Sequence, residues 1–256
     1  MADALEKEDT HANQPAHERR DFLVVLPAVE QLKEMDGLKT KLAVRPDRST
    51  MMVEIGNLMA DEVAEHNAQG IPTKWVLPAG PCDEYDTFVE RVNRERIDCH
   101  NLYVFHMDEF LDWQGRPFPV ADTYESLEGT MLACFYDRID PELRPPEDHR
   151  IWPRIDDIDA ADRLCEELGG VDTVFAGIGA TGLVAFNEEL RSFCYRPTVE
   201  EYAESKTRIV HLNEDSLVAM AERSFGCCLD RIAPMAITLG FKVICSAKRA
   251  DRKSVV

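Results

Sequence analysis

Apolar residues along the chain follow two spacings, one typical of helices and one typical of buried strands. From residue 49 to residue 69 they recur every three or four positions, which predicts a helix that Gly70 ends. Its buried side would carry Met52, Ile55, Met59 and Val63. Short apolar runs predict strands at residues 74–78, 101–106, 171–176 and 207–212. A further strand or turn is expected from residue 236.

Helical patterns separate these predicted strands along the chain. They fall around residues 88–92 and at residues 123–138, 157–168 and 215–228. Strands that alternate with helices are typical of a parallel sheet covered on both faces. We therefore expect an α/β protein with a single doubly wound, mostly parallel sheet, which is a Rossmann-like arrangement. In such sheets ligands bind at the carboxyl ends of the strands.

The first part of the chain has a different character from the rest. Residues 1–20 are polar and charged and show no periodicity, so we expect a mobile segment there. The domain itself is expected to span residues 41–250, and no pattern indicates a second one.

The composition excludes several classes of partner. The chain has 29 basic and 48 acidic side chains, a formal net charge of -19, which opposes binding to nucleic acid or to an anionic membrane. No apolar run approaches the roughly 18 residues of a membrane span. The eight cysteines include no Cys-x-x-Cys spacing, so we expect reduced thiols and no metal site. With no apolar signal segment at the N-terminus, the expected location is the cytoplasm.

Two carboxylates, Asp108 and Glu109, follow the strand predicted at residues 101–106. A carboxylate that is half desolvated at the end of a strand has a raised pKa, which suits a general base. The alternative for such a pair is a helix cap or a salt bridge within a loop.

A glycine-rich loop follows the strand predicted at residues 171–176. Gly177, Gly179 and Gly182 match G-x-G-x-x-G, the dinucleotide-binding pattern, although that pattern belongs in the first strand–helix unit of a nucleotide domain. A glycine loop whose backbone amides approach a sugar or a phosphate fits equally well.

Taken in order, the motifs resemble those of the glucosamine-6-phosphate deaminase family. Residues 105–110 (FHMDEF) resemble the N-M-D-E-Y segment of that family, and residues 77–80 (LPAG) resemble its L-P-T-G phosphate loop. Residues 177–188 (GIGATGLVAFNE) are similar to its G-x-G-x-D-G-H-I-A-F-N-E segment. Three further matches fall at residues 122–126, 205–209 and 236–240, so the resemblance spans roughly residues 41–249.

The resemblance implies a phosphorylated sugar as partner, no cofactor, and conversion of an amino-sugar phosphate to a ketose phosphate with release of ammonia. It implies that Asp108 is the base that moves a proton between sugar carbons. Glu188 matches the glutamate that supports a ring-opening histidine, and Arg223 matches a phosphate-binding arginine. The other positions expected to bind substrate are Gly80, Glu109, Gly177, Gly179 and Gly182. A homo-oligomer is compatible with this assignment.

The chain departs from the family pattern at three places. Thr181 and Leu183 stand where the family has aspartate and the ring-opening histidine, and Pro81 has no N–H to offer a phosphate. Residues 248–256 contain no apolar strand of adequate length, so the domain is expected to be shortened at its C-terminus. These departures favour weak activity. They leave open a 6-phosphogluconolactonase-like hydrolase and a sugar-phosphate-binding protein without catalysis.

Overall fold

The computed structural model describes residues 42–80, 82–179, 182–190 and 195–253. Residues 46–256 form a unit separate from residues 1–45, and the described helices and strands all lie in it. Residues 1–20, predicted to be mobile, lie outside the described part of the chain.

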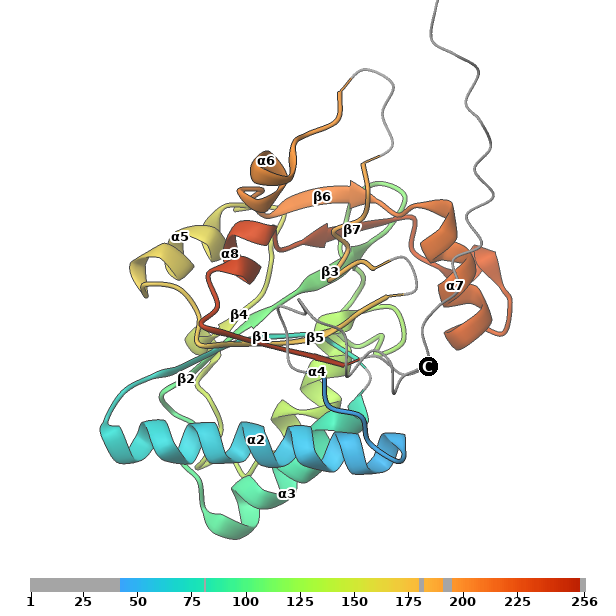
Figure 1. The fold of residues 1–256 in the computed structure, drawn as a ribbon. Coiled ribbons are helices and arrows are strands. Elements are labelled where there is room, and N and C mark those ends of the chain that lie inside the picture. The colour runs from blue at the N-terminus through green and yellow to red at the C-terminus, as the bar shows by residue number, and fades with distance from the viewer. Residues whose placement is uncertain (1–41, 81, 180–181, 191–194, 254–256) are drawn as a thin grey trace, which may run out of the picture. The chain divides into compact units, whose positions relative to one another are not determined.

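A five-stranded sheet forms the middle layer of this unit (Figure 1). Its strands are all parallel and lie in the order β4-β2-β1-β5-β8. Their bounds are Arg150–Ile151 (β4), Leu102–His106 (β2), Thr73–Leu77 (β1), Thr173–Gly177 (β5) and Arg249–Lys253 (β8). The chain proceeds outward from β1 to β4, then returns to β5 on the other side. The predicted doubly wound parallel sheet is confirmed, and its strand order reverses between β1 and β5, where such folds bind ligands.

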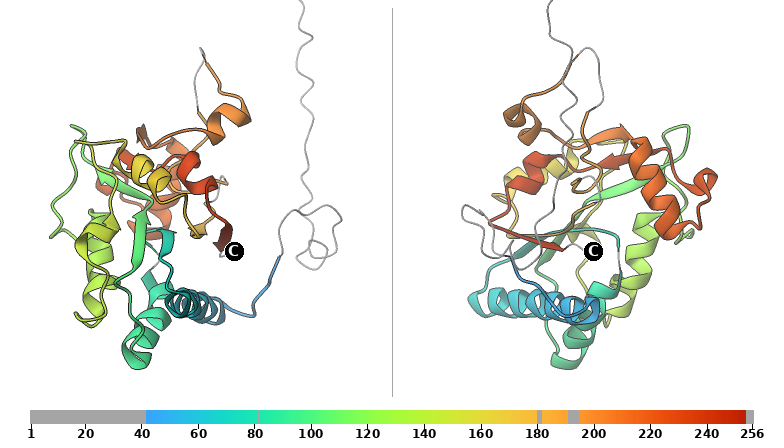
Figure 2. Two further views of the ribbon diagram at one scale, coloured as in Figure 1. Left: turned by 90° about the vertical axis from the view of Figure 1, so that its left-hand side faces the viewer. Right: turned by 45° about the vertical axis from the view of Figure 1, so that its right-hand side comes forward.

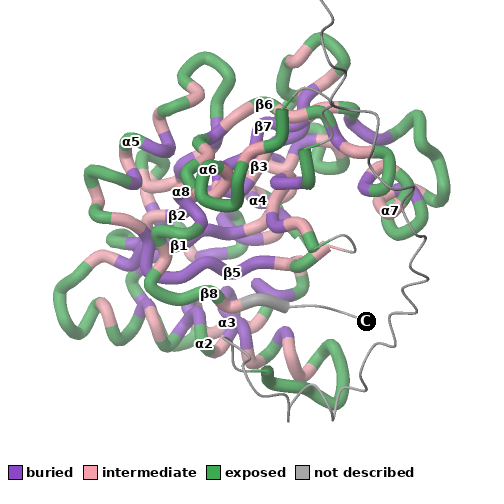
Figure 3. Tube along the Cα trace, turned by 45° about the horizontal axis from the view of Figure 1, so that its top comes forward, coloured by how far each residue is buried: buried purple, intermediate pink, exposed green. Residues whose placement is uncertain are grey.

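Helices cover both faces of this sheet, as predicted (Figure 2). Side chains alternate along a strand, so Trp75 and Leu77 face one layer while Val76 faces the other. The first layer contains α2 (Arg48–Gln69), α3 (Asp86–Glu95) and α4 (Leu127–Cys134), and the second contains α5 (Ala160–Glu167) and α8 (Phe241–Cys245). Burial on both faces keeps β1 and β5 out of solvent along almost their whole length (Figure 3). Short 3-10 helices connect these elements at Cys82–Tyr85, Tyr136–Arg138, Glu147–His149 and Leu229–Arg231.

A second, antiparallel sheet was not predicted. It contains β3 (Asp108–Leu111), β7 (Met235–Thr238) and β6 (Arg208–His211), in the order β3-β7-β6. This small sheet is an addition to the predicted parallel one. Only Met107 separates β3 from β2, and β3 begins with the carboxylates Asp108 and Glu109. No separate apolar run therefore marks β3 in the sequence. Helices α6 (Val199–Ala203) and α7 (Glu214–Ser224) precede and follow β6.

Residues 248–256, in which the sequence shows no apolar strand, nevertheless contain a strand of mostly charged residues. Residues Arg249–Lys253 form β8, which pairs with β5 over five residues. An edge strand pairs with a neighbour on one side only and borders solvent on the other, so its side chains can be charged. Asp172 helps to hold this strand, because its Oδ1 lies 2.8 Å from Nζ of Lys248 and its carbonyl accepts the amide of Arg249 at 2.9 Å.

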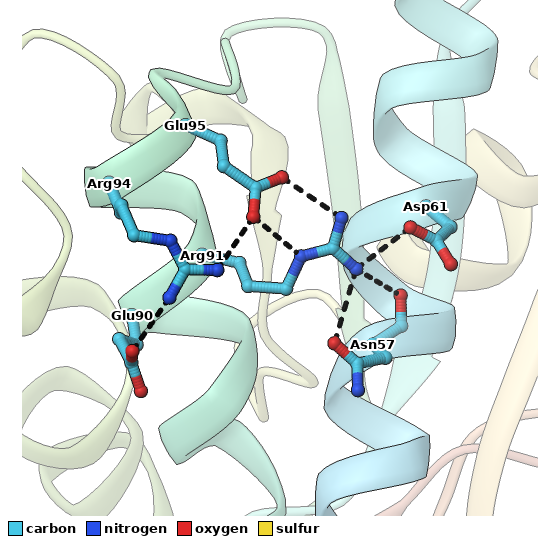
Figure 4. Close-up of polar contacts among 6 residues, drawn as sticks. All are labelled: Asn57, Asp61, Glu90, Arg91, Arg94 and Glu95. Atoms are coloured by element: carbon cyan, nitrogen blue, oxygen red, sulfur yellow. Dashed lines mark hydrogen bonds and ion pairs between the residues drawn. The ribbon is translucent and has the colours of Figure 1, made fainter.

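Polar contacts join α2 and α3 on the outside of the unit (Figure 4). The guanidinium of Arg91 donates to both carboxylate oxygens of Glu95 (3.0 and 2.9 Å), to Asp61 (2.8 Å) and to Asn57 (3.2 Å). Its side chain is 17% exposed, whereas that of the neighbouring Arg94 is 58% exposed. The two arginines therefore provide a comparison between a half-buried and an exposed ion-pair position.

We expect Arg91→Met to lower the free energy of unfolding by about 1 kcal/mol, because three partner residues across two helices lose their donor. Methionine keeps an apolar stem of similar length, so packing changes little. Arg94→Met should change stability by less than about 0.5 kcal/mol, as is usual for an exposed pair. Urea unfolding of both variants measures the difference, and equal losses would contradict the assigned role of Arg91.

Candidate active site

Asp108 lies at the carboxyl end of β2, beside the end of β1. The preceding Met107 donates its amide to the carbonyl of Leu77 at 3.0 Å and accepts the amide of Leu239 at 2.7 Å. These bonds fix the backbone at Asp108 between the parallel sheet and β7. The side chain is half-buried, and among the described residues no donor bonds its carboxylate. Burial, with a smaller contribution from the charge of Glu109, raises the pKa of Asp108 to about 7.

The segment from residue 182 to residue 188 lies over the same face of the small sheet. Asp108 pairs with Thr238 in the antiparallel register, so both side chains project from one face. Thr238 accepts the amide of Phe186 on its hydroxyl at 3.2 Å, and the Phe186 ring lies 5.4 Å from that of Phe110. The side-chain Nδ2 of Asn187 donates to the carbonyl of Leu239 at 2.8 Å. Strand β7 thus holds the end of the glycine loop next to the carboxylate that the sequence indicated as the base.

The glycine loop begins where β5 ends, at Gly177. Its turn is closed by hydrogen bonds from Gly179 to the carbonyl of Leu183 (3.0 Å) and from Gly182 to that of Gly179 (2.9 Å). Gly182 has φ 82°, a left-handed conformation that favours glycine. A Cβ at Gly179 would lie 2.8 Å from Cγ of Leu183, so the leucine side chain packs directly on the loop backbone. Thr181 lies outside the described residues.

Glu188 is buried, and its carboxylate caps α7. One oxygen accepts the amide of Asn213 at 2.6 Å, and the other accepts the hydroxyl of Ser216. Asn213 is the N-cap residue and its own side chain makes no capping bond, so Glu188 binds the start of the helix through the N-cap amide and the hydroxyl in the first turn. A negative charge at a helix N-terminus is favourable because it meets unpaired amides and the positive end of the helix dipole. A supporting role for Glu188 toward substrate remains a prediction.

We expect Glu188→Gln to lower the free energy of unfolding by about 1–3 kcal/mol, because a charge-assisted cap becomes a neutral one in a buried position. Guanidinium unfolding provides the measurement. Glu189→Gln is the matched control, since Glu189 is exposed and follows directly in the sequence. A variant as stable as wild type would show that the capping contacts contribute little.

Glu109 also caps a helix, on the opposite face of β3 from Asp108. Its carboxylate accepts the amides of Leu127 (2.7 Å) and Glu128 (2.8 Å) at the start of α4 and that of its neighbour Phe110 (2.9 Å), and it is 3% exposed. Burial raises its pKa, and these hydrogen bonds oppose the rise. It lines a cavity of about 390 Å³ together with Leu111, Pro117, Pro153, Arg154, Ile155, Asp156 and Ile237. Of the two neighbouring carboxylates, only that of Asp108 faces the glycine loop.

The other predicted substrate-binding residues lie on exposed segments. Gly80 is exposed at the end of the loop that follows β1, where the buried Tyr85 donates its hydroxyl to the carbonyl of Pro78. Arg223 is exposed in the last turn of α7, ten residues after Asn213. At 1.5 Å per residue this is about 15 Å along the helix axis from the end that Glu188 caps. The structure therefore brings Asp108 and the 182–188 segment together but leaves Arg223 at the far end of α7.

Sequence reasoning did not single out Tyr85 or the individual role of Thr238. Thr238 had a weak signal, because it belongs to the matching segment 236–240, whereas nothing in the sequence around Tyr85 marked it. Within the described ranges, no group of three or more His, Cys, Asp or Glu side chains could hold a metal ion. None of the helices there has the length and apolar character to cross a membrane.

Comparison with known proteins places the chain among its relatives. No family model matches it. It is 30% identical over 207 residues to a glucosamine-6-phosphate deaminase of Caenorhabditis elegans, covering 74% of this chain and 70% of the relative. It is 29% identical over 204 residues to that of Bacillus velezensis, covering 77% and 76%.

Solved structures share the fold. A monomeric glucosamine-6-phosphate deaminase superposes with a TM-score of 0.62 at 24% identity, covering 80% of this chain and 77% of that one. A 6-phosphogluconolactonase from Plasmodium vivax gives 0.50 at 14% identity, covering 80% and 74%. With this fold and the similarity to the nematode enzyme, the chain belongs to the glucosamine-6-phosphate deaminase family, whose fold is shared with 6-phosphogluconolactonase.

Proposed function

We propose that this protein binds a phosphorylated amino sugar and acts as a weak glucosamine-6-phosphate deaminase, with Asp108 as the base. The observation that carries the proposal is the state of the Asp108 carboxyl. It is half-buried, its pKa is raised to about 7, and it lies on the face of β3 that the 182–188 segment covers. Family membership supports the choice of substrate class.

The proposed reaction moves a proton between adjacent carbons of the open sugar. Asp108 takes the proton from the carbon that carries the amino group as an enol forms and returns it to the next carbon, which leaves an imine. Water then adds to the imine carbon, and the amino group leaves as ammonia to give the ketone. A base works best when its pKa lies near the working pH, since a stronger base would be protonated and a weaker one would not take the proton. The raised pKa of Asp108 meets this condition near neutrality.

In this proposal the phosphate lies against the backbone of two loops. Gly80, Gly177, Gly179 and Gly182 belong to loops at the carboxyl ends of β1 and β5, on the two sides of the point where the strand order reverses. The amides of Gly179 and Gly182 close the turn, so these glycines contribute by leaving no side chain between the loop backbone and the anion. This suits a protein with a net charge of -19, in which a local site must overcome an unfavourable overall field. A contribution from Arg223 requires the substrate to reach the far end of α7.

A second candidate is a protein that binds sugar phosphates without opening the sugar ring. Leu183 favours it, because leucine can neither donate nor accept a proton and here packs on Gly179. Both candidate functions predict that the protein binds a phosphorylated sugar, and only the deaminase predicts that glucosamine 6-phosphate is converted to product.

The deciding experiment measures formation of fructose 6-phosphate and ammonia from glucosamine 6-phosphate, with glucosamine as the control that lacks phosphate. Thermal melting with glucosamine 6-phosphate, a 6-phosphosugar acid and NAD reports binding, because a ligand of the folded state raises its apparent stability. A melting shift without product supports the binding protein. A shift with NAD alone, or no shift with any phosphosugar, would refute both candidates.

A further inference from the structure

Two cysteines lie together beside the loop that follows β1. Cys82 is the first residue of the 3-10 helix Cys82–Tyr85, and Cys134 is the last residue of α4. Both are free thiols, and both are partly accessible to solvent. Far apart in the sequence, they are brought together by the packing of these two helices.

The residues that follow each cysteine are in contact. The ring of Tyr85 lies edge-on to that of Phe135, with centroids 5.0 Å apart. Arg138 donates from Nη1 to the carbonyl of Cys134 at 3.1 Å and to the carboxylate of Asp86 at 2.6 Å. An aromatic contact and an ion pair, both a few residues after the cysteines, thus fix the two segments against each other.

The two sulfur atoms also interact with each other and with the loop. Cys82 donates from Sγ to the carbonyl of Ala79 at 3.5 Å. A hydrogen bond from the thiol of Cys134 lowers the pKa of Cys82, and this effect outweighs burial and the carboxylates of Asp83 and Asp86, which act the other way. The pKa of Cys134 is correspondingly raised. The pair therefore has one sulfur prepared to be a thiolate, the reactive form, and one held as a thiol beside it.

We propose that Cys82 and Cys134 are an oxidisable dithiol site, and that the agent that modifies it is a hydroperoxide. The thiolate of Cys82 attacks one oxygen of the O–O bond, which gives a sulfenic acid and, after protonation, releases the other oxygen as water from hydrogen peroxide or as an alcohol from an organic hydroperoxide. The sulfur of Cys134 then displaces the second oxygen as water and forms the disulfide. Two sulfurs lose two electrons and two protons, and the hydroperoxide gains both.

The disulfide would act on the loop that the family resemblance assigns to phosphate. Oxidation removes the S–H donor of Cys82 from the carbonyl of Ala79 and links the 3-10 helix to α4 by a covalent bond. The exposed Cys227 and Cys228 lie elsewhere, after α7, and serve as an internal comparison.

The test treats the reduced full-length chain with hydrogen peroxide and follows each cysteine by peptide mass mapping. We expect the first product to be the Cys82–Cys134 disulfide, with the loss of two hydrogen atoms. Cys134→Ser should stop the reaction at the sulfenic acid of Cys82, since the resolving sulfur is gone, and Cys134→Ala should also slow loss of the Cys82 thiol by about tenfold, since the thiolate loses its donor. Cys227→Ser, the control, should leave both rates unchanged.

Cys134→Ala has a side chain that cannot hydrogen-bond at all. It therefore serves as the second variant if the Cys134→Ser protein misfolds or if the serine hydroxyl donates in place of the thiol. Oxidation of Cys227 or Cys228 ahead of Cys82, or a Cys82 that oxidises without linking to Cys134, would overturn the proposal. The readout is sulfur chemistry alone, so its outcome is separate from any result on sugar phosphates.

Discussion

Asp108→Asn is expected to lower turnover of glucosamine 6-phosphate by about 10²–10⁴-fold, the usual contribution of a general base. Asparagine has nearly the same shape, so binding of the sugar phosphate should survive while proton transfer is lost. Turnover is measured as release of ammonia, and binding by calorimetry. Glu65→Gln removes the same charge from an exposed position in α2 and should leave the rate unchanged. A variant that retains wild-type turnover would exclude Asp108 as the base.

The pKa of Asp108 makes this variant informative about pH as well. The wild-type rate should rise as pH increases through about 7, because the base works only when deprotonated. The free energy of unfolding should fall over the same rise in pH. The folded pKa is above its ordinary value of 3.8, so the folded state binds the extra proton, and deprotonation between about pH 4 and pH 7 destabilises it.

Asparagine carries no proton to lose, so Asp108→Asn should be more stable than wild type above pH 7. This gain should vanish below pH 4, where the aspartate is neutral in both states. Thermal unfolding across this range provides the check. A gain that is constant with pH would point to packing, and no gain would mean that the carboxyl is well solvated. An inactive but more stable variant is the combination expected of a residue retained for chemistry.

The sequence predicted the parts of the fold that depend on apolar periodicity. Helix α2 and strands β1, β2 and β5 bury whole faces, so their apolar spacing is strong and their positions were predicted to within a few residues. Strand β8 carries charged residues because it lies at the sheet edge, and hydrophobic pattern cannot reveal such a strand.

The candidate site, too, could be predicted only in part from the sequence. Asp108 could be singled out as a candidate base because its place after an apolar strand already implies partial burial. The contacts of Glu188 and Glu109 could not be predicted, since each carboxylate accepts amides from a helix that starts 18 or more residues later in the chain. A carboxylate that caps such a distant helix looks the same in sequence as one that contacts a ligand. The helix-cap alternative that the sequence left open is what the structure displays for Glu109.

The double substitution Thr181→Asp with Leu183→His is expected to raise turnover of glucosamine 6-phosphate by about 10²–10⁴-fold. It restores the two residues that the family resemblance assigns to ring opening. Imidazole can transfer a proton near neutral pH, whereas the leucine that now packs on Gly179 cannot. Glu188 uses one lone pair on each oxygen for Asn213 and Ser216, and a carboxylate has about four such sites, so it can still accept a bond from the new histidine.

The matched control is Thr181→Asn with Leu183→Asn, which places polar side chains at both positions without a group that titrates near pH 7. It should bind the sugar phosphate and remain slow, so a gain confined to the Asp/His pair would identify proton transfer as the missing step. Adding Asp108→Asn to the Asp/His variant should remove the gain, since ring opening is useless without the enolisation base. If the Asp/His variant folds and binds the sugar phosphate yet turns over no faster than wild type, ring opening does not limit this protein, and the binding function without catalysis becomes the better assignment.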